Sequence, residues 1–234
     1  MSQTMNQPSK SDIALAEVLG GMGRKCLALG GVVIEASQDR DLGTFMRANP
    51  ATAGGVCKAL SLIWIGMHAR ETSFWDWLGT QGAINQVRAQ SVMNTFLSYD
   101  VHVRNFPGGD GDAWKDKWAL DLLKPYGVVA YTGVTGKRPA RSGGKLYAVG
   151  NICDAINSLS DVYIQLSLGG RAGRHAVSFY AGHPDVAFYD PNYGEYWFPD
   201  SRALKPWLAE FMKVSRYDVA LGDDWVMRNY KRGR

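Results

Sequence analysis

The feature that most constrains the fold of this chain is a change in hydrophobic period near Ser160. Before Ser160, apolar residues recur every three or four positions, which is the spacing of one face of an α-helix. After it they alternate with polar residues, as in a half-buried β-strand. Helices followed by an antiparallel sheet are typical of an α+β fold. Because no internal repeat or linker interrupts the pattern, we expect one domain over residues 12–234, preceded by a disordered polar segment over 1–11.

The same periodicities predict where the individual elements lie. Helices are predicted at residues 12–22, 56–68, 83–99, 113–123, 148–159 and 204–214. Strands are predicted at residues 32–34, 161–167, 175–180, 186–189, 196–198, 218–221 and 225–230. Ser11 or Asp12 is the expected cap of the first helix. The polar stretch 37–52 is predicted to be a loop or a broken helix, and the Gly- and Asp-rich stretch 105–112 a loop.

The cysteines indicate a reducing environment. Cys26, Cys57 and Cys153 are an odd number at irregular spacing, which argues against a disulfide framework. A chain of 234 residues, 46% of them hydrophobic, can bury a sizeable core without disulfides or a metal. The opening run MSQTMNQPSKSD is polar, and no apolar run reaches ~18 residues. We therefore expect neither a cleaved signal peptide nor a membrane span.

The net charge of +4 is unevenly distributed. Basic residues gather in the loop 137–145 and at the C-terminal end, in Arg228, Lys231, Arg232 and Arg234. Two explanations stay open for them. They form a solvated loop and a frayed tail, or they attract an anionic membrane surface or an acidic partner. No zinc finger, ribonucleoprotein motif or long basic helix is present, so we expect no nucleic-acid partner.

Cys57 is placed where a cysteine can act as a nucleophile. It follows Gly54 and Gly55 closely and falls in the first turn of the predicted helix 56–68. Glycine lets the backbone approach a neighbour, and the unpaired N–H groups and positive dipole of a first helical turn stabilise a thiolate. A cysteine among leucines and tryptophans is more often a small core residue, which is also our prediction for the other two cysteines. Cys57 therefore fits both a nucleophile and a core position.

His175 and Asp190 lie on two consecutive predicted strands. A hairpin that turns near Gly182 and His183 would place Asp190 roughly opposite His175, provided that the register does not shift. Each residue also has an ordinary structural explanation, the histidine at a sheet edge and the aspartate in a turn before Pro191. Together with Cys57 they would form a nucleophile, a base and a carboxylate that orients the base, in the chain order of papain-like proteases.

Three segments, taken in order, resemble the YopT-like cysteine protease effector family. GGVCKALSLIW, from Gly54, resembles the family's nucleophile motif, in which Gly-x-Cys is followed by Leu-Ser and a Trp at this spacing. HAV, from His175, resembles its histidine strand, and FYDPNYGE, from Phe188, resembles its aspartate motif. The resemblance covers residues 54–198.

The resemblance implies a papain-like α+β fold, in which the nucleophile helix packs on an antiparallel sheet that carries the histidine and the aspartate. It implies that Cys57 is the nucleophile, His175 the base and Asp190 the residue that orients the base. It also implies a bacterial virulence effector that is secreted into the host-cell cytoplasm without a cleaved signal peptide and cleaves a peptide bond in a host protein. This chemistry needs no metal and no cofactor.

The oxyanion that forms in such a reaction needs hydrogen-bond donors. The backbone N–H of Cys57 is one expected donor. Asn49 and Thr52 are the nearest polar candidates for the second, and Gln38 is farther away.

Two other functions stay open. The first is a deamidase or transglutaminase-like toxin that uses the same triad, because one fold hosts many reactions. The second is a non-catalytic effector that acts by binding a host protein. The mass of the product separates the first from a protease, and replacement of Cys57 separates the second.

Overall fold

The computed structural model describes residues 10–37, 56–96, 111–131, 137–139, 145–170, 173–222 and 224–233. Several predicted features lie outside the described residues. These are the polar segment up to Ser9, most of the basic loop 137–145 and the oxyanion candidates Gln38, Asn49 and Thr52. What the sequence predicts for them stays a prediction.

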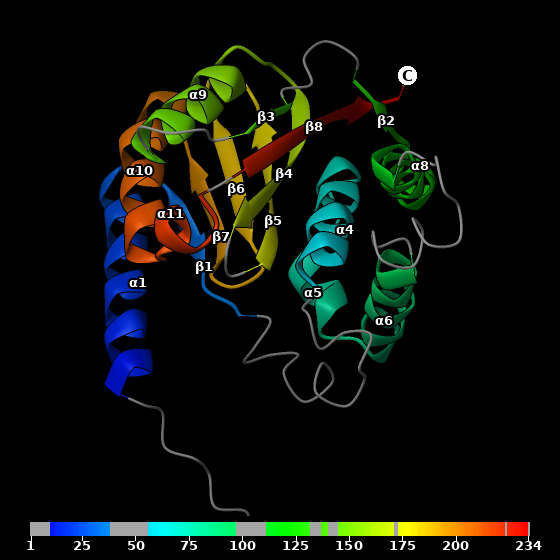
Figure 1. Ribbon diagram of the computed structural model, residues 1–234, viewed down its shortest axis with the longest axis horizontal. Coiled ribbons are helices and arrows are strands. Elements are labelled where there is room, and N and C mark those ends of the chain that lie inside the picture. Colours follow the sequence, from blue (N-terminus) through cyan, green and yellow to red (C-terminus); the bar gives the residue numbers. More distant parts are fainter. Residues whose placement is uncertain are drawn as a thin grey trace, which may run out of the picture.

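An antiparallel sheet forms the centre of the structure (Figure 1). Its strands are β1 (Val32–Ile34), β2 (Val128–Ala130), β3 (Lys137–Pro139), β4 (Val162–Gly170), β5 (Gly173–Ala181), β6 (Val186–Asp190), β7 (Gly194–Phe198) and β8 (Asp224–Arg232). They run in the order β1-β7-β6-β5-β4-β8-β2, and β3 also pairs with β8. Every strand pair is antiparallel, so the expected α+β architecture is confirmed.

Helices cover both faces of this sheet (Figure 1). One face carries α4 (Cys57–Ala69), α5 (Phe74–Leu78), α6 (Gln81–Phe96) and α8 (Gly111–Leu123), with the 3₁₀ turn η1 (Lys124–Tyr126). The other carries α1 (Lys10–Ala28), α9 (Lys145–Asn157), α10 (Leu204–Val214) and α11 (Tyr217–Ala220), with the 3₁₀ turn η2 (Ser201–Ala203). None of the described helices combines the length and the apolarity needed to cross a bilayer.

Each layer of helices has its own apolar core because side chains alternate along the strands. On β5 and β6, Phe179 and Phe188 belong to the core beneath α9 and α10. Ala187 and Tyr189 belong to the core beneath α4. The central strands are therefore apolar on both faces, which explains why the sequence of β6 reads as a nearly continuous hydrophobic run.

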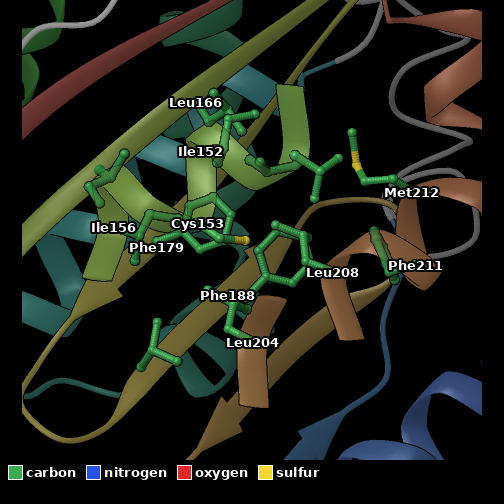
Figure 2. Close-up of a cluster of buried hydrophobic side chains, with 14 of the residues drawn as sticks. Ile152, Cys153, Ile156, Leu166, Phe179, Phe188, Leu204, Leu208, Phe211 and Met212 are labelled. Carbon is green, nitrogen blue, oxygen red and sulfur yellow. The ribbon is translucent and has the colours of Figure 1, made fainter. Parts of the chain in front are cut away.

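The core on the α9 and α10 side is rich in large aromatic and aliphatic side chains. Figure 2 shows Cys153 of α9 among them, facing side chains of the sheet and of α10. Cys153 and Cys26 are both fully buried, so the predicted core position of these two cysteines is confirmed.

Helix α4 is the most enclosed helix of the other layer. Ten of its thirteen residues are buried, because the helix lies between β5 on one side and α6 and α8 on the other. A helix enclosed in this way is apolar on most of its surface, as the sequence between Cys57 and Ala69 largely is. The packing of α4 against β5 is what brings the predicted nucleophile to the sheet.

One predicted strand is wrong. Residues 218–221 were expected to extend the sheet, but Tyr217–Ala220 forms the short helix α11. A stretch of four residues is too short for periodicity to distinguish strand from helix. The turn before it is decided by Arg216, whose φ of 61° reverses the chain after α10. Tyr217, the first residue of α11, is buried in the core on the α9 and α10 side.

The C-terminal basic residues are not a frayed tail. Arg228, Lys231 and Arg232 belong to β8, which pairs with β4 on one side and β2 on the other. Arg228 is buried and forms an ion pair with Asp116. Strand β8 extends past the predicted 225–230 to Arg232, so it contradicts the tail explanation for all three residues, because residues paired in a sheet do not form a frayed tail.

Several smaller features differ from the expectation. The first helix begins at Lys10, so Ser11 and Asp12 lie inside it rather than at its cap. Helix α5 and strands β2 and β3 were not predicted at all, and β3 lies at the start of the stretch 137–145 that was expected to be a loop. Strand β2 has only three residues and depends on its partner β8, which the local sequence does not show. Helix α5 did carry a readable signal, because Ser73 caps it by accepting a hydrogen bond from the Asp76 amide.

Candidate active site

Cys57 is the first residue of α4 and so lies in its first turn, where the sequence placed it. The preceding Val56 is in the N-cap position and makes no side-chain cap hydrogen bond. The positive end of the helix dipole is therefore available to the residue that opens the helix. Cys57 is half-buried, whereas the other two cysteines are fully enclosed. Of the three thiols, only Cys57 lies at a helix terminus with part of its surface exposed.

His175 and Asp190 come together from neighbouring strands. The last pair of the β5–β6 ladder is Ser178 with Tyr189. The same register places Asp190 opposite Val177, which is two positions from His175. A register offset of two keeps both side chains on the same face of the sheet, because the side-chain period is also two. The two residues are therefore diagonal neighbours, and His175 Nε2 lies 2.9 Å from Asp190 Oδ1.

The imidazole of His175 links Cys57 to Asp190. Because Nε2 binds the carboxylate, Nδ1 is the nitrogen that remains for the hydrogen bond to Cys57. Burial lowers the pKa of His175, but the charge and hydrogen bond of Asp190 raise it more, to about 10. Burial raises the pKa of the Cys57 thiol, but the hydrogen bond and charge of His175 lower it more, below its ordinary value. The pair is suited to exist as thiolate and imidazolium.

Asp190 is completely buried, and its Oδ1 has further donors. The backbone N–H of Asn192 donates to Oδ1 at 2.8 Å. The Tyr217 hydroxyl lies 3.5 Å from the same oxygen. Oδ2 has no hydrogen-bond partner among the described residues. The donors to Oδ1 hold the carboxylate in one orientation, which fixes the tautomer and the ring plane of His175.

Tyr217 contacts both His175 and Asp190, and the sequence analysis missed it. Its ring centroid lies 5.0 Å from that of His175, and its hydroxyl accepts a hydrogen bond of 2.7 Å from Asn192 Nδ2. With the lone pairs engaged by Asn192, the hydroxyl proton is left to face Asp190. No local signal could have identified Tyr217, because its contacts with His175 and Asp190 join residues that are far apart in the chain.

The arrangement can form a nucleophile beside a proton donor and acceptor. No group of His, Cys, Asp or Glu side chains in the described part of the chain is placed to hold a metal ion. The chemistry supported by these side chains is nucleophilic attack by sulfur, with proton transfer through the imidazole.

Comparisons with known proteins agree with this geometry. Residues 37–230 match peptidase family C58, described as Yersinia/Haemophilus virulence surface antigen. Cysteine protease yopT1 of Yersinia enterocolitica serotype O:8 is 29% identical over 186 residues, which cover 73% of this chain and 54% of that protein. Cysteine protease YopT of Yersinia pseudotuberculosis is 28% identical over the same shares. The chain thus spans about half the length of the curated relatives it matches.

A solved structure shares the fold. The crystal structure of the Pseudomonas avirulence protein AvrPphB matches with a TM-score of 0.50 and 17% identity, over 78% of this chain and 95% of that chain. At this identity the similarity concerns the arrangement of helices and strands. The fold expected from the sequence is confirmed by this match.

Proposed function

Because this chain belongs to peptidase family C58, the Yersinia/Haemophilus virulence surface antigen family, we propose that it is a cysteine endopeptidase with Cys57, His175 and Asp190 as its catalytic residues. The observation that carries the proposal is the position of His175, which binds Asp190 through Nε2 and Cys57 through its other nitrogen. The curated relatives are named cysteine proteases, which supports the same reaction.

The reaction follows from the two charged groups. The Cys57 thiolate attacks the scissile carbonyl carbon and forms a C–S bond. The oxyanion then collapses, the peptide C–N bond breaks, and the His175 imidazolium gives its proton to the leaving amine. The now neutral imidazole takes a proton from water, whose oxygen attacks the thioester carbonyl, and the thiolate leaves. Asp190 holds the imidazole through Nε2 and takes no part in the bond changes.

The oxyanion donors belong to the proposal as well. The backbone N–H of Cys57 opens helix α4 and lies beside the attacking sulfur, so it is the first donor. Asn49 and Thr52 stay the proposed sources of the second donor.

We extend the proposal to the biological setting. The family and the Yersinia relatives support a secreted virulence effector that cleaves a host protein. An anionic membrane surface stays one of the two explanations for the basic stretch 137–145, whose first three residues form β3.

The test is covalent labelling by an epoxide inhibitor of papain-like proteases, measured by intact mass on the wild type, Cys57→Ser and His175→Ala. We expect one adduct on the wild type and none on either variant. Circular dichroism of the variants shows whether they are folded. An unlabelled wild type, or an adduct on Cys26 or Cys153, would contradict the assignment.

A second measurement separates protease from deamidase or transferase. The protein is incubated with a peptide library, and the products are analysed by mass. Fragments that are absent with Cys57→Ser are expected of a protease. A small mass shift on intact peptides would instead assign deamidase or transferase chemistry to the same residues.

A further inference from the structure

Two buried serines join the nucleophile helix to the histidine strand. The Ser61 hydroxyl on α4 donates to the carbonyl oxygen of Ala176 on β5 at 2.9 Å. The Ser178 hydroxyl on β5 donates to the carbonyl oxygen of Ser61, also at 2.9 Å. Both serines have 0% of their surface exposed. We call this pair of hydrogen bonds the serine latch.

The latch lies directly beside the two reacting groups. Ser61 follows Cys57 by one helical turn and shares its face of α4, and Ala176 follows His175. The Ala176 amide hydrogen-bonds to the Cys57 sulfur. One residue of β5 therefore binds Cys57 through its N–H and Ser61 through its carbonyl oxygen.

The end of a strand ladder makes this contact possible. The last β5–β6 pair is Ser178 with Tyr189, so Ala176 lies beyond that ladder. Ala176 is paired with Ser167 in the β4–β5 ladder, but on its other side its N–H and carbonyl oxygen contact α4 instead of β6. An unpaired carbonyl at this depth would be costly, and the Ser61 hydroxyl satisfies it.

Ser61 makes a long-range hydrogen bond in place of the usual local one. A serine inside a helix commonly donates to the carbonyl four residues earlier, which here is that of Cys57. Ser61 instead donates across the interface to β5. Most contacts of α4 within this core are apolar, and apolar contacts have no preferred direction. Hydrogen bonds are directional, so the latch restrains the position of the helix along β5 more closely than apolar contacts can.

We infer that Ser61 and Ser178 are positioning residues, which set the separation between the Cys57 sulfur and the His175 imidazole. The inference rests on the proposed function, because it assigns the latch to that pair of reacting groups. Neither serine needs to touch the substrate. Their effect is on alignment, and small errors in alignment are costly in catalysis.

The test measures how the alkylation of Cys57 by iodoacetamide depends on pH, with the adduct counted by intact mass. The variants are Ser61→Ala and Ser178→Ala. The matched control is Ser91→Ala, which removes a hydroxyl from the buried Ser91 of α6, away from the candidate site. Ser178→Thr keeps the hydroxyl on β5 and is the rescue variant. Urea unfolding of each variant separates misalignment from loss of stability.

On the acid side of the profile, the alkylation rate reaches half of its maximum at a pH that we call the acid midpoint. We expect each latch variant to raise this midpoint by roughly 0.5 to 1 pH unit. The rate at about pH 6 should fall roughly three- to tenfold, which is the effect of about one hydrogen bond. Ser91→Ala should keep the wild-type profile even where it loses comparable stability. Ser178→Thr should also keep the wild-type profile.

The outcomes distinguish the inference from the proposed function. A wild type that alkylates Cys57 with the midpoint of an ordinary thiol contradicts the proposed function itself. A low wild-type midpoint that both latch variants retain overturns the inference alone. The inference is also overturned if Ser91→Ala shifts the midpoint as far as the latch variants do. Should Ser61→Ala fail to fold, Ser178→Ala makes the same test with helix α4 unchanged.

Discussion

Glu195 Oε2 on β7 accepts a hydrogen bond of 3.0 Å from the indole Nε1 of Trp64 on α4. The same oxygen accepts a second bond of 2.9 Å from Trp75 Nε1 on α5. The Trp64 ring also stacks on Tyr189, with centroids 5.5 Å apart and planes at 8°. Tyr189 precedes Asp190, so this contact ties the nucleophile helix to the strand of the aspartate. It joins two of the three segments that resemble the effector family.

The Trp64–Glu195 contact should be measurable as a coupling energy. Trp64→Phe keeps the stacking ring and removes the donor, and Glu195→Gln removes the charge. We expect each to lower the free energy of unfolding by about 1–3 kcal/mol, because a buried N–H is lost or left without a charged acceptor. A double-mutant cycle in urea should show that the two effects are not additive. Additive effects would mean that the bond contributes nothing beyond packing.

Cys57 should be the one cysteine that alkylates rapidly near neutral pH. Burial raises the pKa of Cys26 to about 11 and that of Cys153 to about 12, so both stay protonated and enclosed. We expect iodoacetamide to give a single adduct on the folded protein. Peptide mapping should place it on Cys57, and Cys57→Ser should abolish it. In urea all the thiols become accessible, which is the positive control. A second fast adduct on the folded protein would contradict the burial of the other thiols.

The His175–Asp190 pair should make stability depend on pH. The pKa of His175 rises from 6.5 to about 10 on folding. The stabilisation is therefore fully present below about pH 6.5 and is lost as the pH rises toward 10. The difference in free energy of unfolding between the wild type and His175→Gln should shrink over this interval. Urea unfolding at a series of pH values measures it, and a difference that grows with pH would show the sign to be wrong.

Asp190→Asn should make the protonated form of His175 less stable without removing its hydrogen-bond acceptor. The amide oxygen can still accept from His175 Nε2, but the negative charge that raises the pKa of His175 is gone. We expect the alkaline transition in the pH profile of Cys57 alkylation, at which His175 loses its proton, to move to lower pH. Proteolysis should fall by roughly 10²-fold. Asp185→Asn, at the other end of the β5–β6 hairpin, is the matched control and should retain the wild-type profile. An unchanged alkaline transition in Asp190→Asn would argue against the orienting role of this carboxylate.

Tyr217→Phe should have a small effect on rate and little on substrate binding. It keeps the ring on His175 and removes the hydroxyl near Asp190. Because 3.5 Å is a long hydrogen bond, we expect kcat to fall only about two- to fivefold, with KM unchanged. The control is Tyr230→Phe, which removes a hydroxyl from Tyr230 of β8. Tyr230 is buried in the core on the face of the sheet opposite to Tyr217. A raised KM with unchanged kcat would assign Tyr217 to binding instead.

Local pattern was sufficient for most of the longer elements and for the choice of Cys57, His175 and Asp190 as candidates. Apolar spacing predicted α4 and the strands that carry His175 and Asp190, because burial on one face or on all sides leaves a period in the sequence. Two glycines before a helix start also singled out Cys57. The pairing of β5 with β6 follows from a short hairpin. These features depend on residues that are close in the chain.

Tertiary structure decided the contacts between residues that are far apart in the chain. Whether Asp190 would lie opposite His175 or two positions away depended on the strand register, which the turn alone does not determine. The acceptor of the Ser61 hydroxyl is 115 residues away, and that of the Trp64 indole 131 residues away. Such partners are selected by how α4 packs on the sheet. The side chains reveal their chemistry in the sequence, but only the packed helix and sheet determine which of them meet.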